Sequence, residues 1–228
     1  YWITYYIETG NFAYRRIIHG PFIQHVNHWL FSILGANDFT MRLPVALISS
    51  TLPLSALFFR EHLRKAETVG LALFLAINPV ILYYSRFMRS DLLVATFMFT
   101  AFGLLVRFYD TRRVRYLYAA TIAIVLAVGS KENAPLYVLT WLGAGAILLD
   151  ASLHRPRNYR GGLELIATKL AQFRDRLGRI RQEPKFYVGH AVGIALVAVG
   201  LFVFLFAPRA GGVEGIDQPP AGHSLWAA

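Results

Sequence analysis

The chain has 228 residues, of which 56% are hydrophobic, and its formal net charge is +10. The hydrophobic residues form long blocks, which are typical of membrane spans and argue against a soluble domain. The sequence contains no cysteine, which excludes a disulfide framework and a thiolate metal site. A basic chain can bind nucleic acid or anionic lipid, and here the hydrophobic blocks favour a membrane protein that binds no nucleic acid.

Six hydrophobic segments predict an all-α fold, a polytopic bundle of transmembrane helices with interfacial amphipathic helices. The segments are residues 39–59, 68–84, 92–109, 116–129, 134–149 and 186–207. A crossing needs about 20 residues, so the fourth and fifth segments need their flanks or a bend between them. The predicted parts are an extracytoplasmic loop with an interfacial helix (1–38), a transmembrane core (39–150), a basic cytoplasmic loop (151–185), a last transmembrane helix (186–207) and an extracytoplasmic loop (208–228).

The distribution of basic residues predicts how the chain lies in the cell membrane. Sixteen of the 23 lysines and arginines fall in the gaps after the first, third and fifth segments, if Arg107 at the end of the third segment is counted with the gap that follows it. Six alternating crossings place these gaps on one side, which the positive-inside rule identifies as cytoplasmic. We therefore expect a multi-pass protein with residues 1–38, 85–91, 130–133 and 208–228 outside.

Two further segments are predicted to be helices that do not cross. Residues 163–180 have apolar side chains at alternating spacings of three and four, with basic side chains on the other faces. Such a helix lies on an anionic leaflet or, alternatively, packs on the protein as a solvated helix. Pro21 suits the first position of a helix over 21–34. We expect the polar face of that helix to meet water, and residues 1–19 to form a loop. The polar face comprises Gln24, His25, Asn27, His28 and Ser32.

Ionisable residues are scarce inside the segments and gather at the predicted outer ends. Arg86 and Arg89 lie three residues apart at one such junction, and paired guanidinium groups suit a phosphate or pyrophosphate. Alternatively, both arginines contact lipid head groups, and Asp91 or Ser90 caps the next helix. A transporter would keep charges or broken helices near the midplane, and the sequence shows little of either.

A second junction holds Lys131 and Glu132 in a tight turn between two apolar runs. Lys131 departs from the positive-inside trend, which favours a functional cation over a local pair with Glu132. His25 and His28 have a spacing that suits metal binding, but no third ligand accompanies them. We therefore predict no cofactor and leave a divalent metal open.

The first segment begins with two charged residues. Asp38 is a candidate helix cap, and Arg42 has Asp38 or a lipid as its candidate partner. The sequence has no Gly-rich phosphate loop, no acid-any-acid metal motif and no Gly-x-Ser-x-Gly elbow. Soluble nucleotide substrates are therefore not indicated.

These motifs together resemble the front of a lipid-phosphate-dependent glycosyltransferase of the multi-spanning C superfamily. The resemblance covers about residues 1–150 and rests on Glu8-Thr9-Gly10, Phe12, Tyr14, His19-Gly20-Pro21-Phe22, Leu34-Gly35, Asp38, Arg42-Leu43-Pro44, Tyr84-Ser85-Arg86-Phe87, Arg89, Asp91 and Ser130-Lys131-Glu132. That superfamily includes protein O-mannosyltransferases and bacterial aminoarabinose transferases. The chain is most similar to a prokaryotic, largely archaeal branch associated with glycan-lipid flipping in N-glycosylation.

The resemblance implies transfer of a sugar from a polyprenyl or dolichyl phosphate to a protein, lipid or glycan acceptor on the outer side. It implies that Arg86, Arg89 and Lys131 bind the donor phosphate and that His19, His25 and Arg42 shape the acceptor pocket. Asp91 and Glu132 are secondary candidates for acidic roles. In the family an Asp-Glu pair before the stretch matching Trp2–Gly10 supplies the catalytic base, so we expect an N-terminally truncated piece without it.

Two other functions are compatible with the sequence. One is a flippase or transporter of a lipid-linked glycan, which would use broken helices near the midplane. The other is a non-catalytic subunit of a glycosylation assembly, for which loss of Arg86 or Lys131 would leave activity intact. Anionic lipids are expected partners of the basic loops in every case.

Overall fold

A computed structural model describes residues 2–12, 14, 20–154, 167–168, 170–171, 174 and 184–208. Most of these residues are helical and none of them forms a strand, which confirms the predicted all-α class. The helices are α1 (Trp2–Thr9), α2 (Pro21–Leu34), α3 (Asp38–Ser50), the 3₁₀ helix η1 (Leu52–Phe59), α4 (Lys65–Ile77), α5 (Pro79–Tyr84), α6 (Ser90–Thr111), α7 (Val114–Ser130), α8 (Ala134–His154) and α10 (Pro184–Phe206). The chain divides into two compact units, Tyr1–Ala134 with Leu196–Ala228, and Pro135–Ala195.

Four helical segments of the described residues are long and apolar enough to cross a membrane. They are Asp38–Phe59, Ser90–Thr111, Ala134–Ala151 and Pro184–Phe206. The predicted crossing at 116–129 corresponds to α7, an apolar helix of 17 residues that falls below the usual length of a span. The predicted amphipathic helix over 163–180 lies almost wholly outside the described residues.

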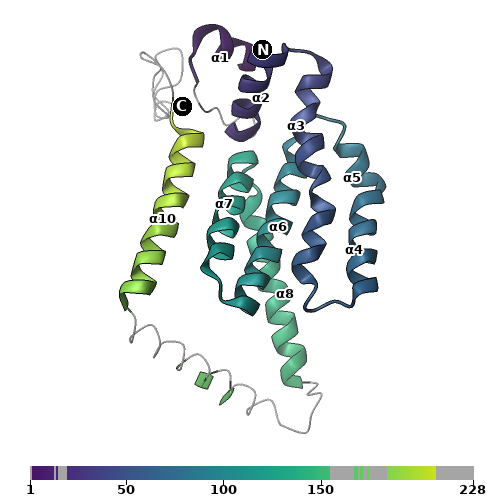
Figure 1. Cartoon of the computed structure of the whole chain (residues 1–228), viewed down its shortest axis with the longest axis vertical. Coiled ribbons are helices and arrows are strands. Elements are labelled where there is room, and N and C mark those ends of the chain that lie inside the picture. The colour runs from purple at the N-terminus through teal and green to yellow at the C-terminus, as the bar shows by residue number, and fades with distance from the viewer. Residues whose placement is uncertain are drawn as a thin grey trace, which may run out of the picture. The chain divides into compact units, whose positions relative to one another are not determined.

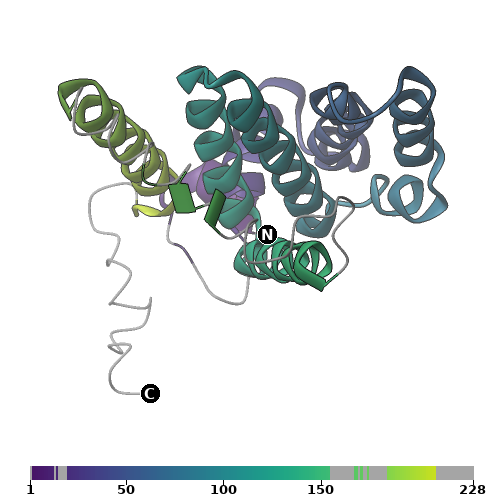
Figure 2. The same ribbon diagram turned by 90° about the horizontal axis from the view of Figure 1, so that it is seen from below.

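The first unit is built around α6, the most deeply buried of its helices. α6 packs against α7 on one side and against α3 and η1 on the other, and α4 packs against η1, so that the helices form a row (Figures 1 and 2). Gly103 allows the close approach of η1, because a Cβ atom there would lie 2.8 Å from the Phe58 ring. Leu93, Val94 and Ala101 of α6 are fully buried.

The N-cap residue of α3 differs from the one predicted. Asn37 is the N-cap residue, and its Oδ1 accepts hydrogen bonds from the backbone N–H groups of Phe39 and Thr40 at 3.0 and 2.9 Å. The Thr40 hydroxyl in turn accepts a hydrogen bond from the Asn37 N–H, which completes a capping box. Asp38, the predicted cap, is exposed and lies 3.8 Å from Arg42 across one helical turn, so the predicted pairing of Arg42 with Asp38 is confirmed.

The predicted continuous segment 68–84 is instead two helices, α4 and α5, with a break at Asn78. Pro79 has no N–H and clashes with the preceding turn, so α4 ends before it. Asn78 Oδ1 starts α5 by accepting hydrogen bonds from the Val80 and Ile81 N–H groups at 2.9 and 3.2 Å. The break within this segment was not predicted, and its crossing of the membrane stays a prediction.

α1 and α2 lie at one end of the first unit (Figure 1); this is called the α2 end below. α1 was missed by the sequence analysis, which expected a loop. The bounds of α2 are as predicted, but three residues of its polar face do not meet water: Gln24, His25 and Asn27 are buried, whereas Trp29, Ile33 and Leu34 are exposed. A helix beside lipid has this arrangement, because lipid solvates apolar side chains and cannot satisfy polar ones.

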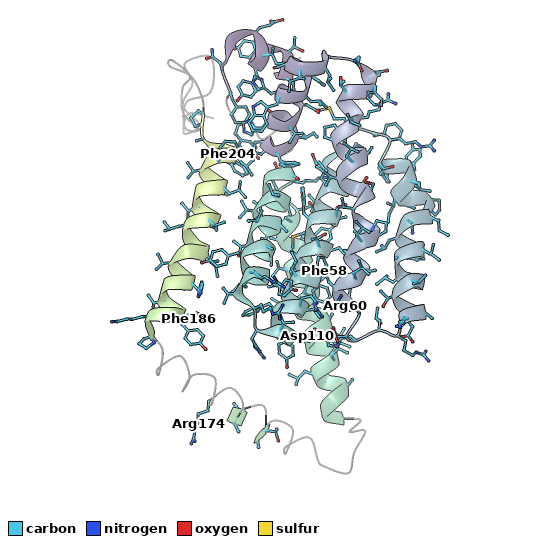
Figure 3. All side chains as sticks on the ribbon, in the orientation of Figure 1. Phe58, Arg60, Asp110, Arg174, Phe186 and Phe204 are labelled. Carbon is cyan, nitrogen blue, oxygen red and sulfur yellow. The ribbon has the colours of Figure 1, made fainter. Side chains whose placement is uncertain are left out.

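The opposite end of the unit carries a cluster of ion pairs. Arg107, which is buried on α6, donates a hydrogen bond to Glu61 at 3.1 Å, and His62 lies 3.1 Å from Asp110. These contacts join the turn after η1 to the end of α6. Figure 3 shows Arg60 and Asp110 at this end and Phe204 near the other. The hydrogen bond and charge of Arg107 lower the pKa of the exposed Glu61 carboxyl.

Candidate functional site

The first part of the candidate site is the junction between α5 and α6. α5 ends at Tyr84, and Arg89 is the N-cap residue of α6 with an extended backbone. The predicted caps, Ser90 and Asp91, are the first residues of the helix, so neither is its N-cap. Asp91 lies in the first turn, where the helix dipole favours a negative charge. Its carboxylate is therefore available to a partner from outside the helix.

The second part is the junction between α7 and α8, which supplies that partner. Lys131 is the first residue beyond α7, and its backbone is extended. The Lys131 ammonium group donates a hydrogen bond to Asp91 Oδ1 across 40 residues of sequence. Its side chain is 20% exposed, compared with 40% for Asp91. The hydrogen-bonded partner of Lys131 is therefore Asp91, in a tertiary pair, and not Glu132, the alternative that the sequence left open.

Arg89 completes an ion triad with these two residues, defined as Arg89, Asp91 and Lys131. Arg89 Nε lies 3.4 Å from Asp91 Oδ2, and the Arg89 guanidinium carbon lies 5.6 Å from the centre of the Tyr84 ring. The Arg89 side chain is 58% exposed. It faces Asp91 through Nε, so both Nη groups remain available as donors to another anion.

Two positive charges and one carboxylate give the triad a net charge of +1. Arg86 lies on the same junction, is exposed, and forms no ion pair with the described residues. The structure thus brings together Arg89, Asp91 and Lys131 and leaves Arg86 at the surface beside them. A partly exposed cationic group of this kind can bind a phosphate.

The N-terminal segment closes against the same α7–α8 junction. The Tyr14 hydroxyl donates a hydrogen bond to Glu132 Oε1 at 2.7 Å. Gly20 has a left-handed backbone (φ 52°), and a Cβ atom there would lie 2.1 Å from the carbonyl oxygen of Ser130. Only glycine fits this contact. The start of α2 is therefore fixed against the end of α7, one residue before Lys131.

His25 lies in a packed aromatic layer at the α2 end. It is 3% exposed, its ring centre lies 4.3 Å from that of Phe12, and its Nε2 lies 2.8 Å from the carbonyl oxygen of Leu205. Because a carbonyl can only accept, Nε2 is protonated and donates. Leu205 is in the last turn of α10, where carbonyl groups lack helical partners. His25 thus caps α10, and its role in an acceptor pocket stays a prediction.

The other two predicted pocket residues are Arg42 and His19, and the structure describes only the first. Arg42 is partly exposed at the start of α3 and pairs with Asp38, as described above. His19 lies outside the described residues. Within the described ranges, no group of three His, Asp or Glu side chains is placed to hold a metal ion.

Comparison with known proteins identifies the family of the chain. The model of the dolichyl-phosphate-mannose-protein mannosyltransferase family matches residues 18–171, more than half of the chain. Neither a curated protein nor a solved structure matches it significantly. The matched range includes α2 and all three residues of the triad. This chain therefore belongs to the dolichyl-phosphate-mannose-protein mannosyltransferase family and is a membrane glycosyltransferase.

Proposed function

We propose that the chain transfers a sugar from a polyprenyl or dolichyl phosphate to a protein, lipid or glycan acceptor on the extracytoplasmic face, and that the triad binds the donor phosphate. The supporting observation is that two charged junctions, 40 residues apart, meet through the Lys131–Asp91 hydrogen bond. Both lie at helix ends, where the head group of a lipid donor would be found. We also propose that the chain belongs to the archaeal branch of the family that it resembles.

The reaction follows from the chemistry of the donor. An acceptor hydroxyl oxygen attacks the anomeric carbon of the sugar as the bond from that carbon to the phosphate oxygen breaks. The phosphate leaves with the bonding electrons, and the acceptor proton passes to a base. Negative charge develops on the leaving oxygen, so a cation there stabilises the transition state more than the ground state.

The triad suits this leaving group because its net positive charge is held in place. Asp91 faces both cations and fixes Lys131 and Arg89 relative to each other. A preorganised pair of cations needs no rearrangement as the charge develops. Asp91 and Glu132 are themselves engaged, by the cations and by Tyr14. We therefore propose that neither Asp91 nor Glu132 is the base.

A flippase for a lipid-linked glycan is the second candidate function. The break between α4 and α5 favours it, because transporters build binding sites from discontinuous helices. The break lies only six residues from the end of α5, however, and Asn78 satisfies its helix N-terminus internally. The family match supports the transferase.

The test uses the full-length protein in sealed membrane vesicles of known orientation. Radiolabelled dolichyl-phosphate mannose is supplied, and label that reaches protein, lipid and glycan is measured in vesicles of each orientation. Transfer to acceptors exposed on the extracytoplasmic side supports the proposal. Movement of labelled donor across the membrane without any transfer would establish the flippase instead.

A further inference from the structure

The buried face of α2 carries two polar atoms without a partner. Gln24 is 6% exposed and Asn27 is fully buried. In the described part of the chain, Gln24 Nε2 and Asn27 Oδ1 have no hydrogen-bond partner. Buried polar groups are normally paired, because each unpaired one costs about 1–3 kcal/mol. Two unpaired polar atoms on one face of a helix therefore indicate a binding site for a ligand.

The orientation of the Asn27 amide is fixed by its other contacts. Its Nδ2 donates to the carbonyl oxygen of Met41 at 3.3 Å and to Met88 Sδ at 3.4 Å. The opposite orientation would bring Oδ1 against the Met41 carbonyl, which is also an acceptor. Asn27 Oδ1 is therefore an acceptor without a donor, and Gln24 Nε2 is a donor without an acceptor.

α2 contacts the residues that precede two members of the ion triad. Gly20 contacts Ser130, which precedes Lys131, and Asn27 contacts Met88, which precedes Arg89. Gln24 lies one turn after Gly20, and a helical side chain covers the turn that precedes its own Cα atom. A further buried acceptor without a partner in the described ranges, Asn133 Oδ1, lies two residues after Lys131. The unpaired polar atoms thus belong to residues close to the proposed phosphate site.

We infer that Gln24 and Asn27 bind hydroxyl groups of the sugar that the lipid phosphate carries. Residues three apart on a helix share a face, and together they offer one donor and one acceptor. A hydroxyl group both accepts and donates, so it complements this pair. The sugar is bonded directly to the phosphate that the triad is proposed to bind, so its hydroxyl groups lie within the same neighbourhood. This inference rests on the proposed function and adds sugar selectivity to it.

The test measures transfer by the full-length protein from dolichyl-phosphate mannose and from its monodeoxy analogues. Gln24→Met keeps the side-chain length and removes the unpaired donor. We expect its unfolding temperature in detergent to stay the same or rise, because a buried donor without a partner is lost. We expect the KM for the mannose donor to rise about tenfold, because one hydrogen bond to the sugar is lost. Gln24→Ala is the second variant, and Ser32→Ala, an exposed site on the same helix, is the control.

The analogues supply a result that a structural role would not give. The wild type should transfer one monodeoxy sugar about tenfold less efficiently, and Gln24→Met should no longer distinguish that sugar from mannose. Full discrimination and an unchanged KM in Gln24→Met and Gln24→Ala would overturn the inference while leaving the transferase intact. A change confined to the KM of the acceptor would overturn it in favour of an acceptor hydroxyl. Absence of transfer by the wild type from any lipid-phosphate sugar would overturn the proposed function itself.

Discussion

Lys131 donates a hydrogen bond to Asp91 between two helix junctions that are 40 residues apart. Both side chains are partly buried, at 20% and 40% exposure, so removal of one partner leaves a poorly hydrated charge. We predict that Asp91→Asn lowers the free energy of unfolding by about 1–3 kcal/mol and reduces transfer. Thermal unfolding in detergent and the transfer assay measure the two effects.

The reversed pair Asp91→Lys with Lys131→Asp separates the two roles of this contact. It restores the attraction, so stability should recover in part relative to either single reversal. Transfer should not recover, because an aspartate then occupies the position of Lys131 beside the leaving phosphate. Equal recovery of transfer and stability would show that only the pairing matters.

Gly20 provides a steric test of how α2 is fixed to α7. Gly20→Ala places a Cβ atom 2.1 Å from the Ser130 carbonyl oxygen at a residue with positive φ. We predict a loss of about 3 kcal/mol or more in the free energy of unfolding. Gly35→Ala is the matched control, since Gly35 also has a positive φ but no heavy atom within 4 Å of its Cβ position. It should cost about 1–2 kcal/mol, and a similar loss in both variants would contradict the close contact.

His25 provides a test of the aromatic layer at the α2 end. His25→Leu keeps an apolar side chain and removes the donor to the Leu205 carbonyl. We predict a loss of about 1–3 kcal/mol in stability, because that buried carbonyl loses its partner. Hydrogen exchange should become faster in the last turn of α10 and stay unchanged in α4, which packs against η1.

Glu61 makes the opposite end of the unit sensitive to acid. Its pKa is lowered, chiefly by the hydrogen bond from Arg107, so the folded state binds its proton less readily than the unfolded state. The stabilisation is present above the ordinary glutamate pKa and is lost as the pH falls from about 5 through the lowered value. The wild type should unfold at a higher temperature than Glu61→Gln at pH 7, and this difference should disappear in acid. A difference that grows in acid would contradict the sign.

The sequence predicts the helices well because hydrophobic blocks and punctuating residues are local signals. The limits of α2 follow from Pro21 and Gly35. The expectation that its polar face meets water was wrong for Gln24, His25 and Asn27, because amphipathicity does not say which face meets protein. The break at Asn78 was missed although Asn-Pro is a recognised helix boundary, since the apolar run continues on both sides. α1 was missed because eight residues are too short to show a clear period.

The residues of the candidate site were predictable from the sequence, but the contacts between them were not. Arg86, Arg89, Lys131 and Asp91 stand out as charges between apolar runs. Their pairing depends on how α6 and α7 pack, which no local pattern encodes. The sequence therefore offered Asp91 only as an alternative helix cap and Glu132 as an alternative partner for Lys131. Gln24 and Asn27 were recognised only as part of a polar face. Their significance follows from burial and from the absence of partners among the described residues.

We propose that the triad binds the phosphate of a lipid-linked sugar. The direct measurement is transfer from radiolabelled dolichyl-phosphate mannose by the full-length protein, compared among wild type, Arg89→Ala, Lys131→Met and the control Arg113→Ala. Arg113 is an exposed arginine before α7 at the opposite end of the unit. We predict that transfer falls about 100-fold or more in the first two variants, that both remain folded in the membrane, and that Arg113→Ala matches the wild type. Undiminished transfer by Arg89→Ala and Lys131→Met would contradict the claim.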